Sequence, residues 1–210
     1  MVEIPSPPPQ YPPDPTFYEL EKGKHIVRIF DPSSHGTQAL TFRFFGPLSR
    51  FDHHRGTGKS FTPQDDPERG VYYAAFTLSS CLVEIFGDTR VIETEGKQVA
   101  SVEIIQPLLL LDLRGSGAMK AGSVSALAKV SDRHLSQAWS RFFYERTDLY
   151  GTIDGIIFFN AHNDEEAIAL YERARDKLRC PDSQVMALSD RALRPAIQQA
   201  AKDNHLIFKG

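Results

Sequence analysis

Short apolar runs typical of strands and segments of helical spacing both occur along this chain. Runs rich in β-branched and aromatic residues that end at Gly, Pro or Asp are typical of strands. They predict strands over residues 25–30, 70–76, 91–94, 98–105, 108–113, 154–159 and 205–209. Helical spacing or charge placement predicts helices over residues 77–87, 122–129, 133–145, 164–177 and 190–201. Because the strands come in twos and threes between helices and do not alternate with them strictly, the predicted fold class is α+β.

Two of these helices carry signals at their ends. Thr77 is a favourable N-cap and Gly87 a favourable stop for the helix over 77–87, in which Leu78, Leu82 and Ile85 share one face. The segment 164–177 begins with acidic residues and ends with basic ones, as the helix dipole favours.

The N-terminal segment is rich in proline, with half of the 14 prolines between Pro5 and Pro15. Proline fixes φ and lacks an N–H donor, so this stretch should form no helix or sheet of its own. It either lies on the domain surface as an arm or serves as a ligand for the aromatic groove of a partner. The expected division is an arm over residues 1–20 and a single domain over residues 21–210.

The composition excludes several classes of function. The chain is 41% hydrophobic and 24% charged with a formal net charge of −3, which argues against a nucleic-acid binder that works by phosphate neutralisation. Two cysteines, Cys81 and Cys180, are too few for a disulfide scaffold and suit a reducing compartment. No apolar run approaches the roughly 20 residues of a membrane helix, and no secretory signal is visible. We therefore expect a soluble cytoplasmic protein without membrane contact.

Two arginines are candidates for binding an anion. On a strand, Arg28 points the same way as Ile26 and Phe30, so its guanidinium needs a partner. That partner is either an internal acid or a phosphate or carboxylate ligand. Arg50 lies in the loop GPLSRFDHH; it is either solvated or, together with Arg28, clamps a diphosphate.

Tyr73 and Glu84 are the most informative pair. A strand, a tight turn and a helix would bring both side chains to one end of the unit, among small residues that let a ligand come close. The ring could stack on a flat heterocycle, and the carboxylate could hold sugar hydroxyls and stabilise positive charge at an anomeric carbon. The alternative is a core tyrosine and a solvated glutamate.

Other chemistry has weaker support in the sequence. His53 and His54 are adjacent and diverge on either a strand or a helix, so we expect no metal site. Nothing in the sequence supplies a base for Cys81, and a cysteine within a helix is usually a small core residue. Neither a Walker loop nor a GxGxxG motif is present.

Four segments, in order, resemble the motifs of the RES domain, a bacterial family named for an arginine, a glutamate and a serine. They are VRIFDP, GPLSRFD, GVYYAAFTLSSCLVEIFGD and IDGIIFFNAHNDEEAIALYER. The resemblance covers about residues 25 to 177. By motif, the family arginine falls on Arg28, the loop arginine on Arg50, the tyrosine on Tyr73 and the glutamate on Glu84. Tyr72 replaces Tyr73 if the strand register is shifted by one residue.

The resemblance implies an ADP-ribosyltransferase-like fold, with mixed or antiparallel sheets and packed helices. It implies that NAD⁺ is a substrate, cleaved between nicotinamide and ribose by hydrolysis or with phosphate as acceptor, and that no cofactor is required. Arg28 and Arg50 would grip the pyrophosphate, Tyr73 would pack against nicotinamide or its ribose, and Glu84 would stabilise the transition state. The family also implies a toxin neutralised by an Xre-like antitoxin protein; a homodimer is left open.

One position departs from the family pattern. Asn160 stands where the serine is expected, after the strand ending at Phe159. Either Asn160 takes over the ligand contact, or activity is reduced or redirected. Two rival hypotheses therefore accompany the NAD⁺ glycohydrolase or phosphorylase: transfer of ADP-ribose to a macromolecule, and a catalytically weak NAD-binding module.

Overall fold

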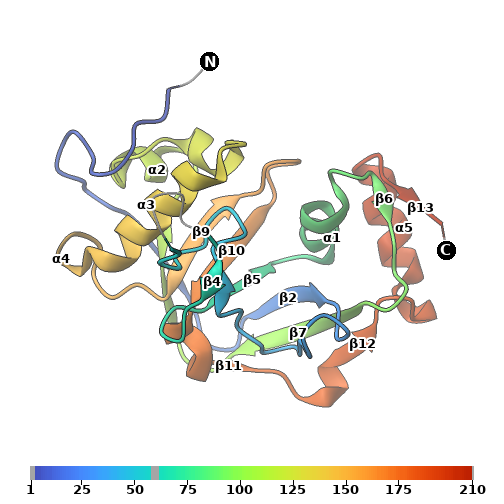
Figure 1. Ribbon diagram of the computed structural model, residues 1–210. Coiled ribbons are helices and arrows are strands. Elements are labelled where there is room, and N and C mark those ends of the chain that lie inside the picture. The colour runs from blue at the N-terminus through green and yellow to red at the C-terminus, as the bar shows by residue number, and fades with distance from the viewer. Residues whose placement is uncertain (1–2, 58–61, 210) are drawn as a thin grey trace.

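A single curled sheet of nine strands forms the centre of the molecule (Figure 1). The computed structural model describes residues 3–57 and 62–209. The strand order is β1-β8-β9-β10-β5-β2-β7-β11, and β12 also pairs with β7. Among the described strands of this sheet, β8 and β9 run parallel and the other neighbours are antiparallel. The bounds are β1 Phe17–Leu20, β2 His25–Phe30, β5 Val71–Ala75, β7 Gln98–Ile104, β8 Leu108–Asp112, β9 Gly155–Phe159, β10 Glu166–Tyr171, β11 Leu178–Arg179 and β12 Val185–Ala187.

Two groups of helices lie against this sheet, so the predicted α+β class is confirmed. In Figure 1 the helices α2 to α4 lie beside β9 and β10, whereas α1 and α5 lie beside β6 at the other end. The helices are α1 Leu78–Phe86, α2 Ser116–Lys120, α3 Arg133–Glu145, α4 Thr147–Tyr150 and α5 Arg194–Asp203. Short 3-10 helices are η1 Ser125–Lys129, η2 Glu172–Lys177, η3 Asp182–Gln184 and η4 Arg191–Leu193. Two small sheets pair β3 Phe45–Gly46 with β4 Gln64–Asp65, and β6 Val91–Ile92 with β13 Ile207–Phe208.

The segment predicted as a helix over 164–177 is instead strand β10 followed by η2, so that prediction is wrong. Along β10, Ala169 and Tyr171 pack on the same side as Trp139 of α3, whereas Ile168 and Leu170 pack into the cluster on the opposite side. An apolar run that is buried on both faces is typical of a central strand. The acidic residues that favoured a helix lie in the preceding turn and at the first position of β10, and the basic ones lie in η2.

Smaller differences concern the ends of elements. The predicted helix over 122–129 is reduced to the 3-10 helix η1, α2 before it was not predicted, and α5 begins later than residue 190. The strands at 91–94 and 205–209 are reduced to two residues each, β6 and β13. Strand β1 was not predicted; it pairs with β8 from within the range expected as an arm.

Helix α1 begins and ends as its sequence predicts, but its buried face is different. The Thr77 side chain caps the helix by accepting a hydrogen bond from the Ser80 N–H at 3.0 Å, and Gly87 is the C-cap. Leu82 is fully buried, whereas Ile85, expected on the same apolar face, is 43% exposed. The helix therefore presents Ile85 and its neighbour Glu84 to a cleft instead of to the core.

The sheet is weakly joined between β5 and β2. Six residue pairs are in register between β2 and β7, but Val27 and Ala75 are the one registered pair between β2 and β5. Arg28 follows Val27 directly, and Tyr73 lies two residues before Ala75. No continuous ladder of hydrogen bonds therefore joins β2 and β5 where Arg28 and Tyr73 lie.

The proline-rich segment packs on the domain. Residues 5–15, all of which the structure describes, contain no helix or strand. The indole N–H of Trp139 donates to the Pro5 carbonyl at 2.8 Å, and the Asp14 N–H donates to the Lys120 carbonyl at 2.8 Å. A side chain at Gly122 would meet Pro9 at 2.6 Å, so the contact there is close.

In the described part of the chain, every helix is too short or too polar to span a bilayer.

Candidate active site

The four motif residues Arg28, Arg50, Tyr73 and Glu84 all line one cleft of about 630 Å³. They come from β2, from the loop after β3, from β5 and from α1 respectively. The volume lies within the range of roughly 300–1,000 Å³ that is usual for small-molecule sites. The structure therefore brings together side chains that the sequence separates widely.

Arg28 is held at the cleft by an aromatic ring and a backbone carbonyl. Its guanidinium carbon lies 4.2 Å from the centroid of the Tyr72 ring, and Nη1 donates to the Thr41 carbonyl at 2.7 Å. No acid among the described residues forms an ion pair with it, so the internal salt bridge considered for Arg28 is absent from this part of the chain. The Arg28 guanidinium therefore lines the cleft without a carboxylate partner among the described residues.

The loop that carries Arg50 is fixed by the buried carboxylate of Asp52. This carboxylate accepts hydrogen bonds from the Leu48 N–H at 2.5 Å and the Ser49 N–H at 2.9 Å. Both of its oxygens lie 2.8 Å from Nη2 of Arg43, so the positive guanidinium is paired with the Asp52 carboxylate. The residues on both sides of Arg50 are thereby fixed in position.

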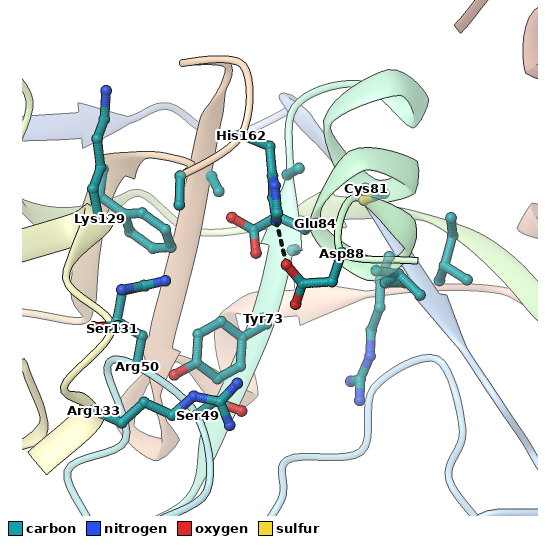
Figure 2. Close-up of a pocket in the computed structure, with 18 residues that line it drawn as sticks. Ser49, Arg50, Tyr73, Cys81, Glu84, Asp88, Lys129, Ser131, Arg133 and His162 are labelled. Carbon is teal, nitrogen blue, oxygen red and sulfur yellow. Dashed lines mark ion pairs between the residues drawn. The ribbon is translucent and has the colours of Figure 1, made fainter. Parts of the chain in front are cut away.

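Arg50 itself is half-buried and has no acid partner among the described residues. Its Nη1 donates to the Val130 carbonyl, which ties the loop to the segment before α3. Burial lowers the pKa of the Arg50 guanidinium, and the nearby Glu84 carboxylate opposes that effect. The charges of Arg50 and Glu84 therefore influence each other, and Figure 2 shows both side chains in the same cleft.

Tyr73 presents its ring to the cleft, while its hydroxyl is engaged behind it. The hydroxyl donates to Asp52 Oδ1 at 2.9 Å and accepts from the Phe51 N–H at 3.0 Å. Burial and the Asp52 charge raise the pKa of Tyr73 well above its ordinary range, so it stays a neutral phenol. Tyr72 is fully buried on the other face of β5 and does not line the cleft, which settles the strand register in favour of Tyr73.

Glu84 projects from α1 into the cleft, accessible to solvent but crowded by protein (Figure 2). No hydrogen bond or ion pair to its carboxylate is formed within the described part of the chain. Burial raises its pKa, His162 and Arg50 lower it, and Asp88 raises it further. A carboxylate without a protein partner in a cleft is available to bind a ligand.

Asn160 lies outside the cleft, contrary to the expectation that it contacts a ligand. It is fully buried, and its amide oxygen accepts from the N–H groups of His162 at 3.0 Å and Asn163 at 2.9 Å. Its amide nitrogen donates to Asn163 Oδ1 at 2.6 Å and to Ser80 Oγ at 3.4 Å. Because all four hydrogen-bonding positions of the amide are used, Asn160 builds the turn after β9 and has no donor left for a ligand.

Several lining residues were missed by sequence reasoning. Lys129, Arg133, Asp88 and His162 all face the cleft, with Arg133 and Lys129 on the wall opposite Asp88 and His162 in Figure 2. Lys129 forms an ion pair with Asp164, whereas Nη1 of Arg133 donates to the Leu48 carbonyl at 3.1 Å. Sequence reasoning missed them because isolated charges on predicted helices usually face solvent. The closeness of Lys129 and Arg133 in the chain was the one available signal of a basic wall.

The cysteine and the paired histidines have structural roles. The Cys81 thiol is buried, donates to the Val27 carbonyl at 3.0 Å, and has its pKa raised to about 12 by burial, which opposes a nucleophilic role. The Nε2–H of His53 donates to Glu172 at 3.0 Å, and Nε2 of His54 lies 3.1 Å from the Arg43 carbonyl oxygen. Across residues 3–57 and 62–209, no group of three or more His, Cys, Asp or Glu side chains is placed to hold a metal ion.

The residues that a known family model matches include all four motifs. The family model of the RES domain matches residues 25–192, which is most of the chain. The chain therefore belongs to the RES domain family.

A relative with a described role is the "Probable toxin y4kH" of Sinorhizobium fredii (strain NBRC 101917 / NGR234). The two sequences are 36% identical over 91 residues, which cover 43% of this chain and 69% of the relative.

Proposed function

We propose that this protein degrades NAD⁺ by cleaving the bond between nicotinamide and ribose, with water or phosphate as the acceptor. The observation that carries the proposal is the common cleft: two guanidinium groups, an aromatic ring and an unpartnered carboxylate line one cavity. These are the groups that a dinucleotide with a diphosphate, flat rings and ribose hydroxyls requires.

Arg28 and Arg50 bind the diphosphate in this proposal. Each has one Nη1 donor engaged with a backbone carbonyl, and neither forms an ion pair with an acid of the described chain. A guanidinium fork matches the oxygens of a phosphate, and its charge is retained at every physiological pH. The carbonyl contacts orient the forks before the substrate binds, which reduces the entropy lost on binding.

Tyr73 and Glu84 act at the reacting end. The Tyr73 ring packs against nicotinamide or its ribose, because its hydroxyl is already engaged by Asp52 and Phe51. The bond between the ribose C1′ and the nicotinamide nitrogen breaks, and its electron pair leaves with neutral nicotinamide. Glu84 stabilises the oxocarbenium-like ribose, and an oxygen of water or phosphate then bonds to C1′ and loses its proton.

The biological role that we propose is that of a toxin which depletes NAD⁺ and is neutralised by an Xre-like antitoxin protein. Membership of the RES family and the description of the relative as a probable toxin support this role. The ADP-ribosyltransferase-like architecture belongs to the same proposal. Its support is the mostly antiparallel curled sheet with the cleft beside its weakest junction.

The decisive experiment measures nicotinamide release from NAD⁺ with and without phosphate. Wild type is compared with Arg28→Ala and Glu84→Gln, and Glu95→Gln, an exposed glutamate outside the cleft, serves as the control. Removal of one stabilising charge costs roughly 3 kcal/mol of transition-state binding, so Glu84→Gln should lower turnover about a hundredfold and relieve toxicity while the protein stays folded. Full turnover by Glu84→Gln would remove Glu84 from the mechanism.

The same reaction mixtures separate the rival functions. With NAD⁺ labelled in the adenosine half, free ADP-ribose or its phosphate supports breakdown, whereas label on a protein or nucleic acid supports ADP-ribose transfer. Measurable NAD⁺ binding without nicotinamide release would instead identify a binding module.

The charge state of Glu84 predicts the pH dependence of the reaction. Burial raises the pKa of its carboxyl, and the stabilising form is the carboxylate. The rate should therefore rise with pH through an acidic limb that lies above the ordinary range of a glutamate. A profile in which the limb persists in Glu84→Gln would assign it to another group.

A further inference from the structure

The loop that carries Arg50 is held by side chains instead of by a sheet. Residues 47–56 contain no helix or strand, although they contribute Arg50 to the cleft. The Asp52 carboxylate accepts from the N–H groups of Leu48 and Ser49, and the Asp52 N–H donates to the Ser49 carbonyl at 3.2 Å. The carbonyls of this loop are acceptors that a second element can hold.

Helix α3 donates to these carbonyls from one of its faces. Arg133, Gln137 and Ser140 follow one another at spacings of four and three residues, which places them in one row along the helix. Nη1 of Arg133 donates to the Leu48 carbonyl at 3.1 Å. Nε2 of Gln137 donates to the Ser49 carbonyl at 3.0 Å. The row therefore reads the loop backbone residue by residue.

The two contacts farther along the row lie away from solvent. Oγ of Ser140 donates to the Phe51 carbonyl at 2.7 Å and lies 3.4 Å from the Tyr171 hydroxyl. Ser140 and Phe51 are fully buried, and Gln137 is 3% exposed. Hydrogen bonds in a low-dielectric interior are stronger than those in water, so these two contacts constrain the loop most.

Arg50 completes the connection from the other side. Its Nη1 donates to the carbonyl of Val130, the residue that follows η1 and precedes the start of α3. Figure 2 shows Arg50 and Arg133 on the same wall of the cleft. Donors therefore cross this boundary in both directions, and the place of the Arg50 guanidinium depends on where α3 lies.

We propose that Gln137 and Ser140 are positioning residues that fix the Arg50 guanidinium in the cleft and thereby strengthen the binding of an anionic substrate. Neither residue lines the cleft, so neither contacts the substrate. They act through the loop backbone, because the carbonyls on both sides of Arg50 are attached to one helix. The role of Arg50 as a diphosphate ligand rests on the proposed function, whereas the attachment of its loop to α3 does not.

Two buried serines of α3 give a matched pair of variants. Ser140 reaches the loop, whereas Oγ of Ser136 donates to the Arg133 carbonyl of its own helix at 3.1 Å. In Ser140→Ala, KM for NAD⁺ should rise roughly threefold to tenfold with kcat retained, because a grip on the diphosphate acts equally on substrate and transition state. In Ser136→Ala, KM should stay unchanged. Equal KM values in the two variants, or a loss in kcat alone, would overturn the proposal.

Gln137→Met is the second variant, and it tests the row even where Ser140→Ala does not fold. Methionine keeps the length of the side chain but removes the donor to the Ser49 carbonyl, so KM should rise as in Ser140→Ala. Arg133 is left unchanged, because it lines the cleft itself and its removal would alter the charge of the site.

A further measurement reads the loop and the anion site without any reaction. The amides of Leu48 and Ser49 should exchange hydrogen faster in Ser140→Ala and Gln137→Met than in wild type and Ser136→Ala. Both loop variants should also bind inorganic pyrophosphate several times more weakly. Combined with Arg50→Ala, Ser140→Ala should add no further loss of pyrophosphate affinity, because both changes act on the same contact.

The outcomes separate this proposal from the proposed function. Unchanged exchange in both loop variants would refute the attachment to α3, and an additive loss in the double variant would refute the link to Arg50. If wild type releases no nicotinamide while exchange and pyrophosphate binding respond as expected, the proposed function fails and the positioning of Arg50 stands.

Discussion

Replacing Asp52 with asparagine tests whether one buried carboxylate holds the whole Arg50 loop. The Asp52 side chain is inaccessible to solvent and accepts from the Arg43 guanidinium, the N–H groups of Leu48 and Ser49, and the Tyr73 hydroxyl. An amide keeps one acceptor oxygen but turns N–H groups toward the other donors, which leaves the Arg43 charge without its partner. Removal of one member of a buried ion pair costs about 3–5 kcal/mol, and the lower end applies because Arg43 is 29% exposed.

We therefore expect Asp52→Asn to lower the free energy of unfolding by about 3 kcal/mol and to raise KM for NAD⁺, because Arg50 loses its support. Urea denaturation and steady-state nicotinamide release measure the two effects. The matched control is Asp154→Asn, which removes a buried carboxylate outside the cleft lining that accepts from the Leu109 N–H and from Lys177 Nζ, both at 2.8 Å. That variant should lose stability with KM unchanged. A free energy of unfolding within about 0.5 kcal/mol of wild type for Asp52→Asn would refute the reasoning.

Three further predictions concern groups outside the reaction. With its thiol pKa raised to about 12, Cys81 should resist iodoacetamide at neutral pH in the folded protein while the partly exposed Cys180 is labelled first, and mass spectrometry that finds Cys81 labelled first would contradict this. Burial lowers the pKa of His53 to about 4, so His53 binds its proton more readily in the unfolded chain. The free energy of unfolding should therefore fall as pH drops from about 6.5 to 4. Urea denaturation at several pH values should show a shallower pH dependence for His53→Gln. Deletion of residues 3–10 removes the Pro5 carbonyl that accepts from the Trp139 indole, so the fluorescence of this single tryptophan should shift to longer wavelength. An unchanged spectrum would show that the arm does not cover the ring.

The error at residues 164–177 shows where sequence patterns reach their limit. Charges at the two ends of the segment favoured a helix, but Ile168 and Leu170 face one cluster while Ala169 faces the other. The free energy lost by exposing either set of apolar side chains exceeds the small free energy gained from charges near a helix dipole. Tertiary burial therefore decided the conformation of this segment. Tertiary packing also decided which face of α1 is buried, because Ile85, which the apolar stripe would have placed in the core, is exposed at the cleft.

The sequence by itself determined the α+β class, the cap of α1 at Thr77 and the order of the motifs that contain Arg28, Arg50, Tyr73 and Glu84. These features depend on local periodicity, on backbone N–H groups within one turn and on residue type, all of which are visible without a partner segment. Only the tertiary structure decided that the four side chains share a cleft, that Asn160 is buried and that His162 lines the same cleft. Those outcomes depend on strand pairings and turns between distant segments, whose geometry is set by packing and by shared hydrogen bonds that no local pattern encodes.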